Sequence, residues 1–438
     1  MRPVRELTVL SLLLSIVGCT TYTRLPLPEK PDLATSVEGK GSPALDMNAV
    51  ATVAVLNNPD LKAARAAAQV GEAQAFSAGL LPNPQVSGSL DRPSDSTIGL
   101  VDAYGLGLTL DLQALLLYPS KRAAANAARD QKRLDLLWQE WQTVAQARTL
   151  YVQSVLAAER RQFLATASAS IILHTARSER ALQAGDLPPE QANGDVAVLF
   201  DVRTRFGAAE RSGLLADQSL RSLLGLGPEV TMSLQPLDSP EIPERAAVAT
   251  ALGQLAQTRP DLRALRAGYE SQEERFRGSV LSQFPNISVG FTKARDTSDI
   301  HTTGFGVTLN LPLFDRGQGA IAIERATRAQ LRAEYQARLD QATGDAWRLW
   351  NEMQEVVAEI HDLDAYLPQL QTTAADAERS YASGDLSVPT YLTMLNALLN
   401  GKSNLLDLQQ SLWTDEIALS TVLGTQIQPS ADTKDSKR

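Results

Sequence analysis

The chain has 438 residues, a formal net charge of −9 and 5% aromatic residues. The negative charge argues against a nucleic-acid partner, and the single cysteine, Cys19, excludes an intrachain disulfide and a thiolate metal cluster. The scarcity of aromatic residues suits closely packed helices better than a thick globular core.

Residues 1–18 are predicted to be a lipoprotein signal peptide. Two arginines precede a short apolar stretch that is about half as long as a bilayer-spanning helix needs. The stretch ends in Ile16-Val17-Gly18-Cys19, which is similar to a bacterial lipobox; the alternative is an ordinary signal peptide with an incidental cysteine. Residues 19–43 are rich in Pro, Thr and Ser and are expected to form an extended tether. No long apolar run follows, so no membrane-spanning helix is expected.

The rest of the chain contains its own landmarks twice, at offsets of 199 to 201 residues. Asn58-Pro59-Asp60-Leu61 returns as Arg259-Pro260-Asp261-Leu262, Gly105-Leu106-Gly107-Leu108 as Gly304-Phe305-Gly306-Val307, Ala184-Gly185-Asp186-Leu187 as Ser383-Gly384-Asp385-Leu386, and Leu224-Gly225 as Leu423-Gly424. A solenoid unit has roughly 20 to 50 residues, so this repeat is a duplicated half-molecule. The predicted organisation is a first repeat at 44–226, a linker at 227–245, a second repeat at 246–425 and a disordered polar tail at 426–438.

The first repeat predicts a helix, a β-hairpin, a long helix and a return helix. The expected elements are a helix at 44–80, strands at 85–91 and 104–112, a long helix at 121–183, and a return helix from 188 to 224. The strands are indicated by alternation of apolar with small or polar side chains. The long helix is indicated by a stretch without Pro or Gly, which Gly185 ends.

The second repeat predicts the same plan. Its expected elements are a helix at 246–282, strands at 286–293 and 303–311, a long helix at 319–382, and a return helix from 389 to 423. Gly384 separates the two helices of this repeat as Gly185 does in the first. Each long helix reaches roughly 95 Å at the α-helical rise, so the chain predicts antiparallel helices about 100 Å tall.

The second long helix carries an uninterrupted heptad pattern. Apolar residues follow 4-3 spacing at Tyr335, Leu339, Ala342, Ala346, Leu349, Met353, Val356, Ile360, Leu363, Leu367, Leu370, Ala374, Ala377 and Tyr381. A period of 3.5 residues held this long predicts left-handed coiled-coil packing. The alternative is a long amphipathic helix in a globular bundle. The first long helix has a shorter version of the pattern, which Arg148 interrupts.

The alternating strands are typical of a membrane β-barrel with lipid outside and water inside. The apolar faces are expected to contact lipid through Leu106, Leu108, Leu110, Phe305, Val307 and Leu309. An open four-stranded sheet would leave unpaired backbone edges in lipid, and about eight strands are needed even for a filled barrel. Several copies must therefore share one barrel, and we expect a homotrimer with 12 strands. The expected fold class is mainly α with a membrane β-barrel contribution.

Together these features resemble the TolC-like outer-membrane efflux protein family, in its lipoprotein branch. The resemblance rests on the lipobox, the duplicated plan, the paired glycine turns and Leu311-Pro312-Leu313-Phe314-Asp315-Arg316-Gly317 after the fourth strand. It implies a trimeric outer-membrane barrel, anchored in outer-membrane lipid and continued by a helical periplasmic tunnel. It also implies a passive exit duct that works with a periplasmic adaptor protein and an inner-membrane transporter, without a cofactor.

The resemblance also assigns functional residues. It implies lipid attachment at Cys19 and adaptor docking at the tip formed by Gly185, Asp186, Leu187, Tyr381, Ser383, Gly384, Asp385 and Leu386. Family members often carry carboxylates that face the closed aperture, whereas the comparable positions here are Thr390, Thr393 and Asn396. Neutral side chains bind cations less strongly than carboxylates, so little cation block is expected.

The sequence holds no pattern typical of an enzyme or a metal site. His174, His301 and His361 each stand alone, without a partner at metal-ligand spacing. The alternative function is therefore a binding one, a periplasmic coiled-coil scaffold lipoprotein whose hairpins pack on a partner. The two hypotheses differ in whether the apolar strand faces contact lipid.

Overall fold

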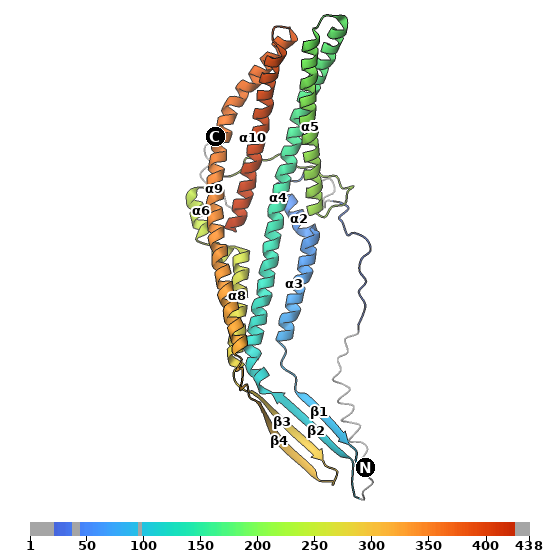
Figure 1. Cartoon of the computed structure of the whole chain (residues 1–438), viewed down its shortest axis with the longest axis vertical. Helices are drawn as coiled ribbons and strands as arrows, with labels where there is room; N and C mark the ends of the chain where they lie inside the picture. The colour runs from blue at the N-terminus through green and yellow to red at the C-terminus, as the bar shows by residue number, and fades with distance from the viewer. Residues whose placement is uncertain (1–21, 37–43, 95–98, 425–438) are drawn as a thin grey trace.

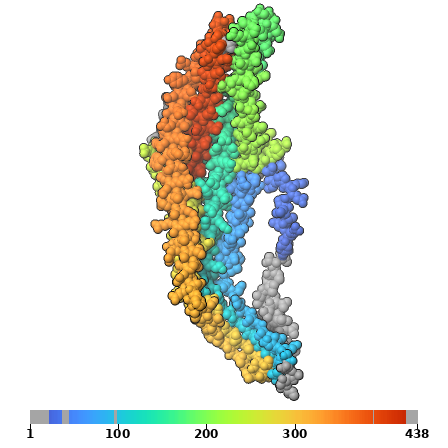
Figure 2. All heavy atoms as spheres, in the orientation of Figure 1, coloured from blue at the N-terminus to red at the C-terminus, as the bar shows by residue number. Residues whose placement is uncertain are grey.

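The computed structural model describes residues 22–36, 44–94 and 99–424. Its helical body is elongated and curved, with an antiparallel sheet at one end and two turns that connect helices at the other (Figures 1 and 2). The architecture confirms the expected fold class, mostly helical with one four-stranded sheet. The signal peptide, Cys19 and the tail at 426–438 lie outside the described residues.

Two long helices set the length of the body. They are α4 (Leu112–Ala184), with 73 residues, and α9 (Gln318–Ala382), with 65 residues. At the α-helical rise these lengths correspond to about 110 Å and about 98 Å. Helix α4 begins nine residues before the predicted start, because the Asp111 carboxylate accepts the Ala114 amide at 3.0 Å and caps the helix there.

Shorter helices line the long ones (Figure 1). They are α2 (Met47–Asn57), α3 (Pro59–Ala78), α5 (Pro189–Leu223), α6 (Arg245–Leu252), α7 (Leu255–Thr258), α8 (Pro260–Leu281) and α10 (Val388–Leu423). The single helices predicted at 44–80 and 246–282 are wrong, because each is broken one residue before a proline. The return helices α5 and α10 lie where the sequence predicts them.

The break in the first repeat, a joint between α2 and α3, is stabilised by hydrogen bonds of one side chain. Asn58 is 4% exposed, and its side-chain oxygen accepts the Leu61 amide at 2.9 Å. Its side-chain nitrogen donates to the Leu223 carbonyl at 2.9 Å, at the end of α5. Pro59 follows at the first helical position, where its missing N–H costs nothing. One side chain therefore starts α3 and satisfies the end of α5.

The second repeat builds the same joint with different chemistry. Arg259, 5% exposed, donates to the Val422 carbonyl of α10 at 3.1 Å and to Asp261 at 2.7 Å. At both joints a glycine at positive φ lies against the break; a Cβ on Gly225 would lie 2.6 Å from the Asn57 oxygen. Two of the repeated landmarks, the proline segment and the leucine-glycine pair, therefore meet in space within each repeat.

The sheet joins the two repeats. Its strands are β1 (Gln85–Asp91), β2 (Ala103–Asp111), β3 (Asn286–Arg295) and β4 (His301–Asn310), all antiparallel in the order β1-β2-β3-β4. The central pair, β2 with β3, unites the two hairpins that the sequence treats separately.

The heptad face of α9 forms the largest apolar cluster of the second repeat. Every heptad side chain is buried or half-buried, and Ala346 and Met353 have no exposed surface. This cluster includes Leu412 and Leu419 of α10.

In the first repeat, the buried phenol of Tyr151 on α4 donates to the Gln235 carbonyl at 2.7 Å and anchors the segment between α5 and α6.

Candidate functional site

The sheet has two chemically different faces. Directly paired residues of antiparallel strands point to the same side, so the register assigns each residue to a face. One face carries Val86, Leu90, Leu106, Leu108, Leu110, Ile287, Val289, Phe291, Phe305, Val307 and Leu309. The other carries Ser87, Ser89, Gly105, Gly107, Thr109, Ser288, Gly290, Thr292, Gly304, Gly306 and Thr308. The six residues predicted to contact lipid share the apolar face.

The apolar face is open in a single chain. Phe305 is 72% exposed and Leu106 is 56% exposed, while Leu110 is half-buried. Large contiguous apolar patches mark membrane or protein contacts. Among the described residues, β1 pairs with β2 alone and β4 with β3 alone, so both edge strands present unpaired backbone groups.

The two glycine turns form the opposite end of the body and are built alike (Figure 1). Gly185 has φ +80° and Gly384 has φ +83°, which favour glycine at the end of a helix. The Asp186 amide donates to the Ala181 carbonyl, and the Asp385 amide donates to the Ser380 carbonyl, each at 2.9 Å. A Cβ on either glycine would meet nothing within 4 Å, so backbone conformation and not space requires glycine there.

The predicted docking residues do not form one uniform surface. Asp186, Ser383 and Asp385 are exposed, and Leu187 and Leu386 are half-buried. The Ser383 hydroxyl donates to the Asp385 carboxylate at 2.7 Å, which fixes the second turn.

Tyr381 belongs to an aromatic cluster beneath the turns, in which Tyr391 is buried and Tyr381 and His174 are half-buried. Its hydroxyl donates to the carboxylate of Asp195 on α5, which is 2% exposed. Its ring stacks on Tyr391 of α10 with centroids 4.8 Å apart, and His174 of α4 meets it edge-on at 4.5 Å. Burial and the Asp195 hydrogen bond raise the pKa of Tyr381. Burial, with Glu378 and Asp195 nearby, raises the pKa of Tyr391 to about 12. The cluster therefore ties all four tip helices together.

Sequence reasoning found Tyr381 but missed Asp195, Tyr391 and the role of His174. Tyr381 and Tyr391 flank Gly384 on two antiparallel helices, and that placement was the available signal for their stacking. No sequence signal pointed to Asp195, because it is one of several carboxylates along α5 and only its burial distinguishes it.

The three aperture candidates point in different directions. Three-residue steps on an α-helix turn about 60°, so Thr390 and Asn396 diverge by about 120°. Thr390 and Thr393 are exposed, and the Thr393 hydroxyl donates to the Pro389 carbonyl at 2.8 Å. Asn396 is half-buried and accepts from Arg205 of α5 at 3.4 Å.

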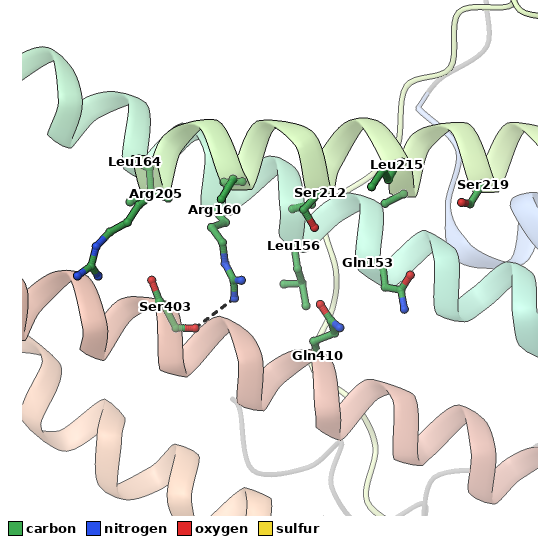
Figure 3. A pocket seen from close by; sticks show the side chains of 14 residues that line it. Gln153, Leu156, Arg160, Leu164, Arg205, Ser212, Leu215, Ser219, Ser403 and Gln410 are labelled. Carbon is green, nitrogen blue, oxygen red and sulfur yellow. Dashed lines mark hydrogen bonds between the residues drawn. The ribbon is translucent and has the colours of Figure 1, made fainter. Parts of the chain in front are cut away.

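A groove runs between the two helical hairpins in the tip half (Figure 3). Its cavity of about 640 Å³ is lined by α4, α5 and α10, with Arg160, Arg205, Ser212, Ser403 and Gln410 among its polar residues. Arg160 donates to the Ser403 carbonyl at 3.3 Å and pairs with Asp407, so its guanidinium bridges α4 and α10.

The described residues offer neither a metal centre nor a helical membrane span. Within residues 22–36, 44–94 and 99–424, no group of three His, Cys, Asp or Glu side chains is placed to hold a metal ion. Over the same ranges, no helix is both long and apolar enough to cross a bilayer.

Comparison with known proteins agrees with this geometry. Residues 251–425 match the family described as outer membrane efflux protein. The chain is similar to CusC, at 20% identity and TM-score 0.74, over 92% of this chain and 99% of that one. It is also similar to the Campylobacter jejuni CmeC outer membrane channel (16%, 0.74, 93% of each chain) and to VceC of Vibrio cholerae (18%, 0.72, 87% and 97%). No curated protein matches the sequence.

Proposed function

We propose that the protein is a passive exit duct of a tripartite efflux system. The proposal starts from two findings: residues 251–425 match the outer membrane efflux protein family, and the whole chain has the fold of TolC-like channels. The protein lies in the outer membrane of a Gram-negative bacterium and projects its helices into the periplasm. Small molecules cross the outer membrane through its pore. Energy is supplied by an inner-membrane transporter, so the duct itself catalyses no reaction.

The two-faced sheet with free edges is the observation that carries this proposal. A lone sheet of this kind is unstable in lipid, because its edge N–H and C=O groups have no water to bind. Three copies that join β1 to β4 around a ring give 12 strands and no edge. The apolar face then meets lipid, and the glycine, serine and threonine face lines water.

The turns at Gly185 and Gly384 support the proposed docking of a periplasmic adaptor. They lie farthest from the sheet, and their exposed residues are accessible beyond the helix ends. Lipid attachment at Cys19 is proposed from the lipobox alone. It would add a second attachment to the bilayer beside the barrel.

Conductance in a planar bilayer tests the duct. We expect the purified protein to give stepwise single-channel currents. The mass of the protein in detergent is expected to be that of a trimer. A periplasmic scaffold conducts nothing, so a folded, correctly assembled protein without current would overturn the proposal in favour of that alternative.

The aperture proposal has its own test. Thr393 is exposed and neutral, so a carboxylate there is expected to create an acidic ring of three and to add block by divalent cations. Thr393→Asp is compared with Thr372→Asp, since both threonines are exposed and donate to a proline carbonyl one turn earlier. Equal block in single-channel recordings of both variants would show that Thr393 is not at the constriction.

A further inference from the structure

The apolar face of the sheet changes chemistry toward the hairpin tips. Along β3 it carries Val289 and Phe291 and then Lys293 and Arg295. Arg295 pairs across the sheet with Tyr104 on β2 and with His301 on β4. A basic and aromatic band therefore borders the apolar band on the same face, at the end away from the helices (Figure 1).

The guanidinium of Arg295 is held in place. Its Nε and Nη2 donate to the Asp102 carbonyl at 3.2 and 2.6 Å, and it lies 5.5 Å from the centre of the Tyr104 ring. An arginine fixed by a carbonyl and stacked on a ring loses little further freedom when it binds an oxyanion. Its Nε and Nη2 face the carbonyl, and its Nη1 lies 3.6 Å from the Asp299 carboxylate.

Lys293 supplies this band with a positive charge that is unpaired among the described residues. Lys293 is exposed, and within the described residues no carboxylate lies within ion-pair distance of it. Asp299, in the β3–β4 turn, lies 3.6 Å from Arg295 and 3.9 Å from His301. The carboxylate of Asp296 is occupied by the amides of Ser298 and Ile300, both at 2.9 Å. These amides leave the charge of Asp296 in place, so the turn holds two carboxylates, one of which pairs with Arg295. Lys293 is thus the cation of this band that no described carboxylate neutralises.

We propose that Lys293 and Arg295 form a binding site for the phosphate groups of lipid A in the outer leaflet. The inference rests on the proposed function, which puts the hairpin tips at the outer surface. There the apolar band lies against acyl chains, and the two cations stand at the depth of the phosphorylated headgroups. Arginine and lysine at a membrane surface each strengthen the attraction to anionic lipid by a similar amount.

Native mass spectrometry of the detergent-purified trimer, titrated with diphosphorylated lipid A, tests the site. We expect Lys293→Gln to weaken binding about fivefold, the effect of one cation near an anionic surface. Asp299→Asn is expected to strengthen binding, because it removes the carboxylate that pairs with the Arg295 guanidinium. Arg203→Gln, at an exposed position on α5, is the matched control and is expected to bind as the wild type does.

The opposite results overturn the site. Unchanged binding in Lys293→Gln, or no gain in Asp299→Asn, would show that the cations do not hold phosphate. Equal competition by phosphatidylglycerol would show that the site takes any anionic lipid and would overturn the assignment to lipid A. Bilayer conductance separates the two proposals. If Lys293→Gln conducts and binds lipid A as the wild type does, the lipid site is wrong and the duct stands. If the wild type gives no current, the proposed duct is wrong.

Discussion

The hydroxyl of Tyr381 connects the two repeats at the tip. Tyr381 lies on α9 and Asp195 on α5, so their hydrogen bond joins one helical hairpin to the other. The second carboxylate oxygen of Asp195 is buried, and the described residues give it no hydrogen-bond partner. The buried carboxylate of Asp195 thus depends on one hydrogen bond, the one from the Tyr381 hydroxyl.

Tyr381→Phe is therefore expected to loosen the tip. A buried acceptor that loses its partner costs about 1–3 kcal/mol, and the opening free energy of amides at 380–391 should fall by this amount in hydrogen exchange. Tyr391→Phe is the matched control: it keeps the stacked rings and removes a hydroxyl that makes no hydrogen bond among the described residues. Equal loss of protection in both variants would contradict a special role for the bond to Asp195.

Asp415 on α10 gives a prediction about pH. It is 8% exposed, and burial, reinforced by Glu352 and opposed by Arg348, raises its pKa from 3.8 to about 6. Between pH 4 and 6 the folded protein holds more protons than the unfolded chain, so its stability falls as pH rises through this window.

Asp415→Asn is thus expected to stabilise the protein at pH 8, by on the order of 2 kcal/mol, and to change it little at pH 4. Thermal midpoints of the variant and the wild type at the two pH values measure this. A difference that is independent of pH would show that the carboxyl does not titrate as its burial indicates.

At the scale of helices and strands, the long helices and the turns that end them could be predicted from the sequence. The heptad of α9 faces the core along its whole length, and the glycines at 185 and 384 end the long helices as expected. The breaks before Pro59 and Pro260 were missed, although proline at a first helical position was a visible signal. Their cause is tertiary, because Asn58 and Arg259 bind the ends of other helices.

The turn at Gly384 predicts a graded response to substitution. At φ +83° a Cβ is strained by about 1–2 kcal/mol, whereas asparagine tolerates the left-handed region better. Gly384→Ala is expected to speed hydrogen exchange of the Asp385 amide, which donates to Ser380 across the turn, more than Gly384→Asn does. Exchange in Gly384→Asn as fast as in Gly384→Ala would show that the left-handed backbone conformation is not what requires glycine in this turn.

At the scale of the whole molecule, the union of the repeats was the least predictable feature. Strand β2 pairs with β3 between Asp111 and Ser288, across more than a third of the chain, and no local pattern encodes that pairing. Alternation predicted the two faces correctly because successive side chains of a strand point to opposite sides of the sheet. Local signals therefore specified the strands and their faces, while the sheet that joins them depends on tertiary pairing.

The free edges of that sheet lead to a prediction about assembly. If β1 of one subunit pairs with β4 of the next, a cysteine on each edge and on the same face falls within disulfide reach in one register. Val86→Cys is combined in turn with Thr303→Cys, Phe305→Cys or Val307→Cys, all on the apolar face with it. Because each chain then carries both partners, oxidation is expected to close a covalent trimer in at least one combination.

Partners on the opposite face are the control for this experiment. Gly304→Cys and Gly306→Cys point to the polar side, so with Val86→Cys they should not cross-link. Any cross-linked species is resolved by denaturing electrophoresis, and Cys19 is replaced by serine throughout so that the engineered pair alone reacts. Oxidised monomer in every combination would mean that β1 and β4 do not meet, and the apolar face would then need a covering other than a shared barrel in lipid.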